Sequence, residues 1–178
     1  MRYRFSAMIL FGTMLLSTLV VAQSKPAASE KPQATSGYVP VLEYDPKRNA
    51  EKDIAAAIKE AHRTNRNVML EVGGKWCVWC GYLDKFFAAN TTIRQYRDEK
   101  YVMVKINYSP ENKNQAVISK YGKVAGYPHI FILDSNGKLL YSEDTSKLEQ
   151  GRGYNLTAVA SFLKDWAPAK EGKSAEAE

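Results

Sequence analysis

The sequence contains two cysteines, which stand three residues apart in Trp76-Cys77-Val78-Trp79-Cys80. A short apolar strand is predicted before this run and a helix after it, so the first thiol lies at a helix N-terminus. Unpaired backbone N–H groups and the helix dipole stabilise a thiolate there, which lowers the pKa of Cys77. The pattern predicts a redox dithiol in which Cys77 attacks a foreign disulfide and Cys80 resolves the mixed disulfide.

Three other interpretations of the cysteine pair stay open at this point. Two buried structural cysteines would not account for the spacing at a strand-to-helix junction, and a permanent disulfide across so short a loop would gain little entropy. The third is a metal site, with His129 joining Cys77 and Cys80 as a ligand. Soft thiolates suit copper(I), so a copper(I) metallochaperone is an alternative function.

The residues around the dithiol alternate between helical and strand patterns. Ile54, Ala57 and Ala61 recur at helical spacing, whereas Val68-Met69-Leu70-Glu71-Val72 is a short, largely apolar strand that ends at Gly73-Gly74. The same reasoning predicts helices at 50–64, 77–89, 92–99, 114–121 and 156–166, and strands at 68–72, 101–107, 129–133 and 138–141. Helices alternating with strands and a final hairpin predict an α/β fold, with a central mixed sheet flanked by helices on both faces.

The first 22 residues have the pattern of a secretory signal peptide. Arg2 and Arg4 precede an apolar run over residues 7–22, and Val20-Val21-Ala22 predicts a cut after Ala22. A permanent membrane anchor is the rival interpretation, but a spanning helix needs about 20 apolar residues and this run is shorter. We therefore expect a periplasmic or secreted protein, in a compartment where disulfides form and persist.

The remaining chain divides into three parts. Prolines in Lys25-Pro26, Lys31-Pro32 and Val39-Pro40 predict a flexible linker over residues 23–44. Residues 45–168 are expected to form one domain, and residues 169–178 a disordered tail. The net charge of +6 is spread along the chain without a basic cluster, so we expect no nucleic-acid partner.

Four local motifs resemble the thioredoxin superfamily, and the resemblance covers about residues 53–166. In chain order they are Glu71 six residues before Cys77, the Trp76–Cys80 run, Lys105, and Gly126-Tyr127-Pro128 ahead of an apolar strand. Thioredoxin itself has Gly-Pro between its cysteines, whereas this chain has Val78-Trp79. In this respect the chain is closer to the C-terminal thioredoxin-like domain of DsbD, a bacterial membrane reductase. The resemblance implies a thioredoxin-like fold.

The resemblance also implies roles for two charged residues near the dithiol. Glu71 falls where the family keeps a buried carboxylate, and Lys105 where thioredoxins keep a lysine facing it. Desolvation within an apolar strand should raise the pKa of Glu71, so that its carboxyl passes protons to and from Cys80. Lys105 would support the site by pairing with Glu71, because a lone buried ammonium is unfavourable.

A substrate-docking loop is the last feature that the resemblance implies. Pro128 is expected to be cis, which would leave the Tyr127 backbone free to pair with a substrate as an added strand. Trp76, Trp79 and the Tyr127 side chain would flank the dithiol and decide which partners fit.

Together these features predict an exported thiol–disulfide oxidoreductase that reduces disulfides of extracytoplasmic proteins through Cys77 and Cys80. The dithiol is the redox centre, so we expect neither a bound cofactor nor a metal. The expected partners are disulfide-containing proteins and a thiol electron donor, soluble or in the membrane, and the chain itself would meet the membrane only through its signal peptide. A redox-silent binding module with the same fold is a further alternative, and the direction of electron flow stays open.

Overall fold

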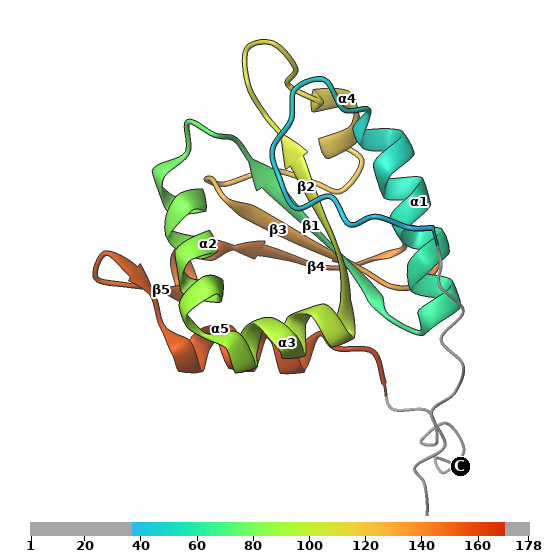
Figure 1. Ribbon diagram of the computed structural model, residues 1–178. Coiled ribbons are helices and arrows are strands. Elements are labelled where there is room, and N and C mark those ends of the chain that lie inside the picture. The colour runs from blue at the N-terminus through green and yellow to red at the C-terminus, as the bar shows by residue number, and fades with distance from the viewer. Residues whose placement is uncertain (1–36, 170–178) are drawn as a thin grey trace, which may run out of the picture. The chain divides into compact units, whose positions relative to one another are not determined.

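The computed structural model describes residues 37–169, and none of the helices in this range is long and apolar enough to cross a membrane (Figure 1). The first half contains α1 (Ala50–Thr64), β1 (Asn67–Gly73), α2 (Val78–Ala89), α3 (Thr91–Lys100) and β2 (Tyr101–Asn107). The second half contains α4 (Gln115–Ile118), β3 (His129–Leu133), β4 (Leu139–Asp144), the 3₁₀ helix η1 (Thr145–Leu148), β5 (Glu149–Gln150), β6 (Gly153–Tyr154) and α5 (Leu156–Asp165). The predicted signal peptide, most of the predicted linker and the tail from residue 170 lie outside the described residues.

Four strands form the central sheet in the order β2-β1-β3-β4. β1 runs parallel to β2, whereas β3 is antiparallel to both β1 and β4. α2 and α3 make the crossover between the two parallel strands. Figure 1 shows α1 on one face of the sheet and α2, α3 and α5 on the other. The predicted mixed sheet with helices on both faces is confirmed.

Alternation along the strands gives each face of the sheet its own core. Val68, Leu70 and Val72 of β1 pack with α1, whereas Met69 packs on the opposite face with side chains of α2 and α5. Glu71 shares the face of Met69 and is 1% exposed. The period of two therefore places the one acid of β1 on the face that α2 covers.

The C-terminal half differs most from the sequence prediction. Regular helix in the predicted range 114–121 is limited to α4. The predicted strand 138–141 is Leu139–Asp144, because pairing with β3 continues as far as Asp144 opposite His129. η1, β5 and β6 lie where the sequence predicts no element, since strands of two residues show no periodicity.

Residues 38–45 form a segment that we call the strap, and it corrects the C-terminal end of the predicted linker. Val41 pairs in parallel with Val104, and its carbonyl accepts a hydrogen bond from the Lys105 N–H at 2.8 Å. Val41 and Tyr44 are each 5% exposed. A proline argues against helix but is compatible with pairing at a sheet edge, so composition alone misassigned this segment.

Candidate active site

The junction between β1 and α2 brings the two cysteines together. Cys77 is the N-cap of α2, and its Sγ accepts a hydrogen bond from the backbone N–H of Cys80 at 3.1 Å. A disulfide joins the two residues, whose Cα atoms are 5.3 Å apart. Cys77 therefore lies at the positive end of the helix dipole, a position that stabilises a thiolate once the disulfide is reduced.

Both cysteines are largely covered, and Cys80 more completely than Cys77. Cys80 is 2% exposed and Cys77 is 7% exposed. Gly73 packs directly against Cys80, since a Cβ on this glycine would lie 2.5 Å from the Cys80 Sγ and 2.8 Å from the Tyr44 Oη. The absence of a side chain at residue 73 is what lets β1 approach the disulfide so closely.

Glu71 lies buried on the strand next to the disulfide and has two polar partners. It is in register with Lys105 across β1 and β2, and the Lys105 Nζ lies 3.5 Å from the Glu71 Oε1. The Tyr44 hydroxyl donates a hydrogen bond to the same oxygen at 2.5 Å. Desolvation by burial raises the pKa of Glu71, while Lys105 and Tyr44 oppose part of the rise. The predicted Glu71–Lys105 pair is present.

Lys105 has further neighbours that the sequence prediction missed. Its Nζ lies 2.5 Å from the Asp84 Oδ1 and 4.8 Å from the centre of the Tyr44 ring. Asp84 follows Cys80 by one helical turn, and this i, i+4 spacing is a signal that points to it. Tyr44 has no comparable spacing to a site residue, because it lies in the strap, which the sequence does not mark as a helix or strand. We call Tyr44, Glu71, Asp84 and Lys105 the polar cluster.

A second group of side chains beside the disulfide is aromatic. Trp76 is 54% exposed, and its Nε1 donates a hydrogen bond to the Tyr108 carbonyl at 2.6 Å. The Tyr127 ring meets Trp76 edge-on with centroids 5.3 Å apart and stacks on Tyr108 at 5.0 Å. We call Trp76, Tyr108 and Tyr127 the aromatic flank. Tyr108 was absent from the sequence prediction because it lies in a loop with no recognisable motif.

The other two residues of the predicted docking loop and flank are Pro128 and Trp79. The Tyr127–Pro128 peptide bond is cis, and the Pro128 carbonyl accepts a hydrogen bond from the Thr145 hydroxyl at 2.6 Å. Trp79 packs against the cysteine pair, and its ring also meets Tyr154 of β6 edge-on at 6.0 Å. Trp79 therefore connects the dithiol to the core on the face of the sheet that α2 and α5 cover. This contact is separate from the docking role that the sequence predicts.

His129, the third ligand of the copper(I) alternative, is buried at the start of β3. Its Nε2 lies 2.8 Å from the Ser142 Oγ, and its ring packs against Phe131 with centroids 4.7 Å apart. Burial lowers the pKa of this imidazole. Within residues 37–169, no group of three or more His, Cys, Asp or Glu side chains is arranged to hold a metal ion.

Comparison with known proteins shows which fold the chain has. The model of a family described as thioredoxin-like matches residues 49–135, a range that runs from α1 through β3 and includes both cysteines. A disulphide isomerase from Xylella fastidiosa Temecula1 has a similar fold, with a TM-score of 0.59 and 23% identity over 72% of this chain and 98% of that one. Residues 49–135 are therefore similar to a thioredoxin-like family, and the described part of the chain has a thioredoxin-like fold.

Other solved structures are similar at lower scores. The C-terminal domain of Neisseria meningitidis DsbD in its oxidised form is 21% identical, with a TM-score of 0.47 over 71% of this chain and 99% of that one. A thioredoxin-fold protein from Helicobacter pylori is also 21% identical, with a TM-score of 0.42 over 56% and 70%. A comparison with curated proteins finds no match. The thioredoxin-like fold and the Cys77–Cys80 disulfide together support a thiol–disulfide oxidoreductase.

Proposed function

We propose that this protein is an exported thiol–disulfide oxidoreductase that reduces disulfides of extracytoplasmic proteins. The observation that carries the proposal is the Cys77–Cys80 disulfide at the N-cap of α2, with the buried carboxyl of Glu71 on the neighbouring strand. The Val78-Trp79 dipeptide, which resembles the C-terminal domain of DsbD, supports the reducing direction. The pattern of a signal peptide over residues 1–22 supports a periplasmic or secreted location.

In the first step, the Cys77 thiolate attacks one sulfur of the substrate disulfide. A bond forms between that sulfur and the Cys77 Sγ, while the other substrate sulfur leaves as a thiolate and takes up a proton. Cys77 suits the attacking role for two reasons. The N-terminus of α2 stabilises its thiolate, and it is the less buried of the two cysteines.

In the second step, Cys80 releases the mixed disulfide. Its thiol gives up a proton, with Glu71 as the final acceptor, and the resulting thiolate attacks the Cys77 Sγ. The Cys77–Cys80 bond forms and the second substrate sulfur leaves, so two electrons have passed from the dithiol to the substrate. Burial raises the pKa of Glu71, which brings it closer to that of a thiol and makes it a better proton acceptor.

Trp76, Trp79, Tyr127 and Pro128 form the substrate-docking surface in this proposal. Trp76 is the most exposed of the site aromatics and offers a large apolar contact beside the disulfide. The Tyr127 backbone lies just before β3 and would pair with an extended segment of the substrate. Such a surface favours unfolded or flexible protein chains that present a disulfide in an accessible segment.

A thiol electron donor must reduce the Cys77–Cys80 disulfide again after each turnover. This donor is a soluble protein or a membrane protein whose own dithiol is the stronger reductant. Since the two cysteines carry the electrons, the proposed reaction uses no bound cofactor. Lys105 acts indirectly, because its charge adjusts the proton affinity of Glu71.

Turnover of a disulfide-linked protein substrate tests the proposal directly. With a dithiol as electron donor, the wild type should reduce the substrate catalytically, and Cys77→Ser should lose at least about 10³-fold in rate. Cys80→Ala should accumulate the covalent mixed disulfide, which mass spectrometry detects. A wild-type protein that leaves the substrate oxidised under these conditions would be a redox-silent binding module instead.

Alkylation of the reduced protein tests the two cysteine roles separately. At neutral pH, iodoacetamide should label Cys77 well before Cys80, because Cys77 has the helix N-terminus and the greater exposure. Equal labelling, or faster labelling of Cys80, would contradict the assignment.

The reduction potential of the Cys77–Cys80 couple tests the direction of electron flow. A potential of about −270 mV would support a reductase, whereas one of about −120 mV would make the protein an oxidant of its partners. Equilibration with glutathione buffers of known ratio, followed by quantification of the two thiols, gives this value.

A further inference from the structure

The hydroxyl of Tyr44 lies beside the dithiol and has no role in the two steps above. It donates a hydrogen bond to the Glu71 Oε1 at 2.5 Å. It also lies 2.8 Å from the Cβ position of Gly73, and the Cys80 Sγ lies 2.5 Å from that same point. The hydroxyl and the buried sulfur are therefore separated by no more than the sum of these two distances. Tyr44 is thus hydrogen-bonded to Glu71 and packs in one cluster with Cys80, the two groups that must exchange a proton.

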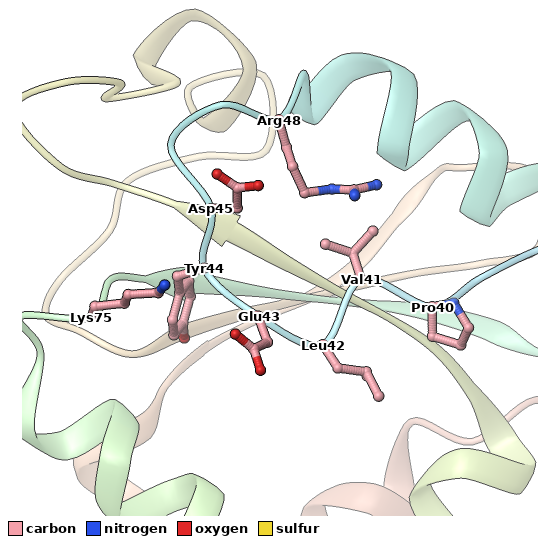
Figure 2. Close-up of a pocket in the computed structure, with 8 residues that line it drawn as sticks. All are labelled: Pro40, Val41, Leu42, Glu43, Tyr44, Asp45, Arg48 and Lys75. Atoms are coloured by element: carbon pink, nitrogen blue, oxygen red, sulfur yellow. The ribbon is translucent and has the colours of Figure 1, made fainter.

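The strap holds Tyr44 in this position from outside the sheet. Val41 is hydrogen-bonded to β2 through its carbonyl and packs in the core that contains α1. Figure 2 shows Val41 pointing toward α1, while the Tyr44 ring points away from it. On that other side the ring packs against Cys77 and Cys80. Because Val41 anchors the strap, the Tyr44 hydroxyl stays next to Glu71.

A pocket gives these groups a route to solvent. It has a volume of about 340 Å³, and its lining includes Tyr44, Cys80, Asp84 and Lys105. Figure 2 shows the neighbouring pocket of about 330 Å³, which shares Tyr44 and other strap residues with the first. The Asp84 side chain is 54% exposed, so the polar cluster extends from the buried Glu71 to the surface.

We infer that Tyr44 links Cys80 to Glu71 during release of the mixed disulfide, an inference that rests on the proposed function. The Cys80 thiol gives its proton to the Tyr44 oxygen as the Tyr44 hydroxyl gives its own proton to the Glu71 carboxylate. The tyrosine starts and ends neutral. The Cys80 thiolate then attacks the Cys77 Sγ, the Cys77–Cys80 bond forms, and the substrate sulfur leaves as a thiolate.

The surroundings of Tyr44 keep it neutral, as this role requires. Desolvation by burial raises the pKa of Tyr44 well above its ordinary value, and the nearby Glu71 carboxylate raises it further. Asp84 of α2 and Tyr154 of β6 act in the same direction. A tyrosine that does not ionise near neutral pH can still pass a proton by accepting one and donating another.

Charges from three elements set the proton affinity of Glu71. Burial raises the pKa of its carboxyl, and Asp84 of α2 adds to that rise. Lys105 of β2, the Tyr44 hydrogen bond and Arg97 of α3 lower it. Loss of the Tyr44 hydroxyl removes one of the opposing effects, so the pKa of Glu71 should move further up.

The variant Tyr44→Phe tests the inference, because it removes the hydroxyl and keeps the ring that packs on the cysteines. We expect release of a preformed mixed disulfide to slow by about tenfold, measured by rapid mixing between pH 6 and 9. The initial attack by Cys77 should stay within about twofold of the wild type, and the pH midpoint of release should move up. Tyr121→Phe, which loses a hydroxyl beside Phe131 in the other core, is the matched control and should behave as the wild type.

The double variant Tyr44→Phe/Glu71→Gln completes the test. If the hydroxyl acts through Glu71, the double variant should release no more slowly than Glu71→Gln alone. Additive losses would overturn the inference, as would a Tyr44→Phe protein with the release rate and pH midpoint of the wild type. A wild type that reduces no disulfide would overturn the proposed function, and the inference with it. A wild type that turns over beside an unaffected Tyr44→Phe would overturn the inference alone.

Discussion

The polar cluster and the aromatic flank border the same disulfide, yet they meet solvent in opposite ways. Glu71 is 1% exposed, whereas Trp76 is 54% exposed. Glu71 has polar partners from the strap and β2, while Trp76 contacts the Tyr127 ring and the Tyr108 backbone carbonyl. One group suits proton transfer, because burial raises the pKa of the Glu71 carboxyl, and the other suits contact with a partner protein.

Because of this difference, substitutions in the polar cluster and in the aromatic flank should affect different kinetic constants. A group that handles protons changes the rate of a chemical step, and its effect depends on pH. A group that contacts the substrate in the ground state and the transition state alike changes KM and leaves kcat unaltered. The following predictions test that separation, beginning with the largest expected effect.

Glu71→Gln should give the largest effect in the polar cluster. Without its proton acceptor, Cys80 should release the mixed disulfide about 10²-fold more slowly, while the attack by Cys77 changes much less. Stopped-flow reduction of a model disulfide separates the two steps. If Glu71→Gln turns over like the wild type between pH 6 and 9, Glu71 is a structural residue and the polar cluster has no part in proton transfer.

The same substitution should change how stability depends on pH. Because burial raises the pKa of Glu71 above its ordinary value of 4.5, the folded protein holds this proton at pH values where the unfolded chain has lost it. The free energy of unfolding should therefore fall as pH rises from 4.5 through the folded pKa, and Glu71→Gln should lack this fall. Urea unfolding of both proteins across that window measures it. Parallel curves for the two proteins would contradict the prediction.

Two neighbouring glycines allow a direct comparison of the polar cluster and the aromatic flank. A Cβ on Gly73 would collide with the Cys80 Sγ and the Tyr44 Oη, which are both buried, so Gly73→Ala should destabilise the fold by about 1–3 kcal/mol. A Cβ on Gly74 would lie 3.0 Å from the Tyr108 carbonyl oxygen, and its closer contact would be the Trp76 side chain, which is exposed and can move aside. Gly74→Ala should therefore be less destabilising.

Gly81→Ala is the control for these two substitutions. Gly81 lies in α2 with open space around its Cβ position, so alanine should be neutral there or stabilise the helix by up to about 1 kcal/mol. Urea unfolding of all three variants gives the order. A Gly73→Ala protein as stable as Gly81→Ala would show that the disulfide side is loosely packed.

Trp76→Ala should have a smaller effect, confined to binding. Loss of the exposed ring should raise KM for a protein substrate by about fivefold with kcat unchanged, because most of its contact with a partner is apolar area. Steady-state kinetics with a protein substrate and with a small disulfide provide the comparison, since the small disulfide should show little change. A drop in kcat at unchanged KM would place Trp76 in the chemical step instead.

Asp84→Asn should have the smallest effect. The Asp84 carboxylate raises the pKa of Glu71, so its removal should lower that pKa and shift the pH midpoint of release downward. Because this side chain is more than half exposed, solvent screens its charge, and the rate at neutral pH should change by about twofold at most. The pH profile of release, measured as for Glu71→Gln, detects the shift. An upward shift would contradict the assigned sign.

The sequence predicted the parts of the site that lie on long, periodic elements. Glu71 and Lys105 fall on seven-residue strands that the sequence marks as apolar runs, and the resemblance to thioredoxins implied their roles. Cys77 opens a helix of twelve residues. Tyr44 was missed because its position depends on pairing between the strap and β2, residues about 60 apart in the chain. Tyr108 was missed for a related reason, since only the folded loop brings it beneath the Tyr127 ring.

Pairing of the strap with β2 also has a consequence for the solubility of the domain. Through Val41, the strap occupies hydrogen-bonding groups at one edge of the sheet, and an uncovered edge is a template on which another chain can add as a strand. A protein shortened to begin at Asp45 would expose the backbone of β2 beside an apolar core. Such a protein should self-associate as its concentration rises, even though every residue of α1 and of all the strands would still be present.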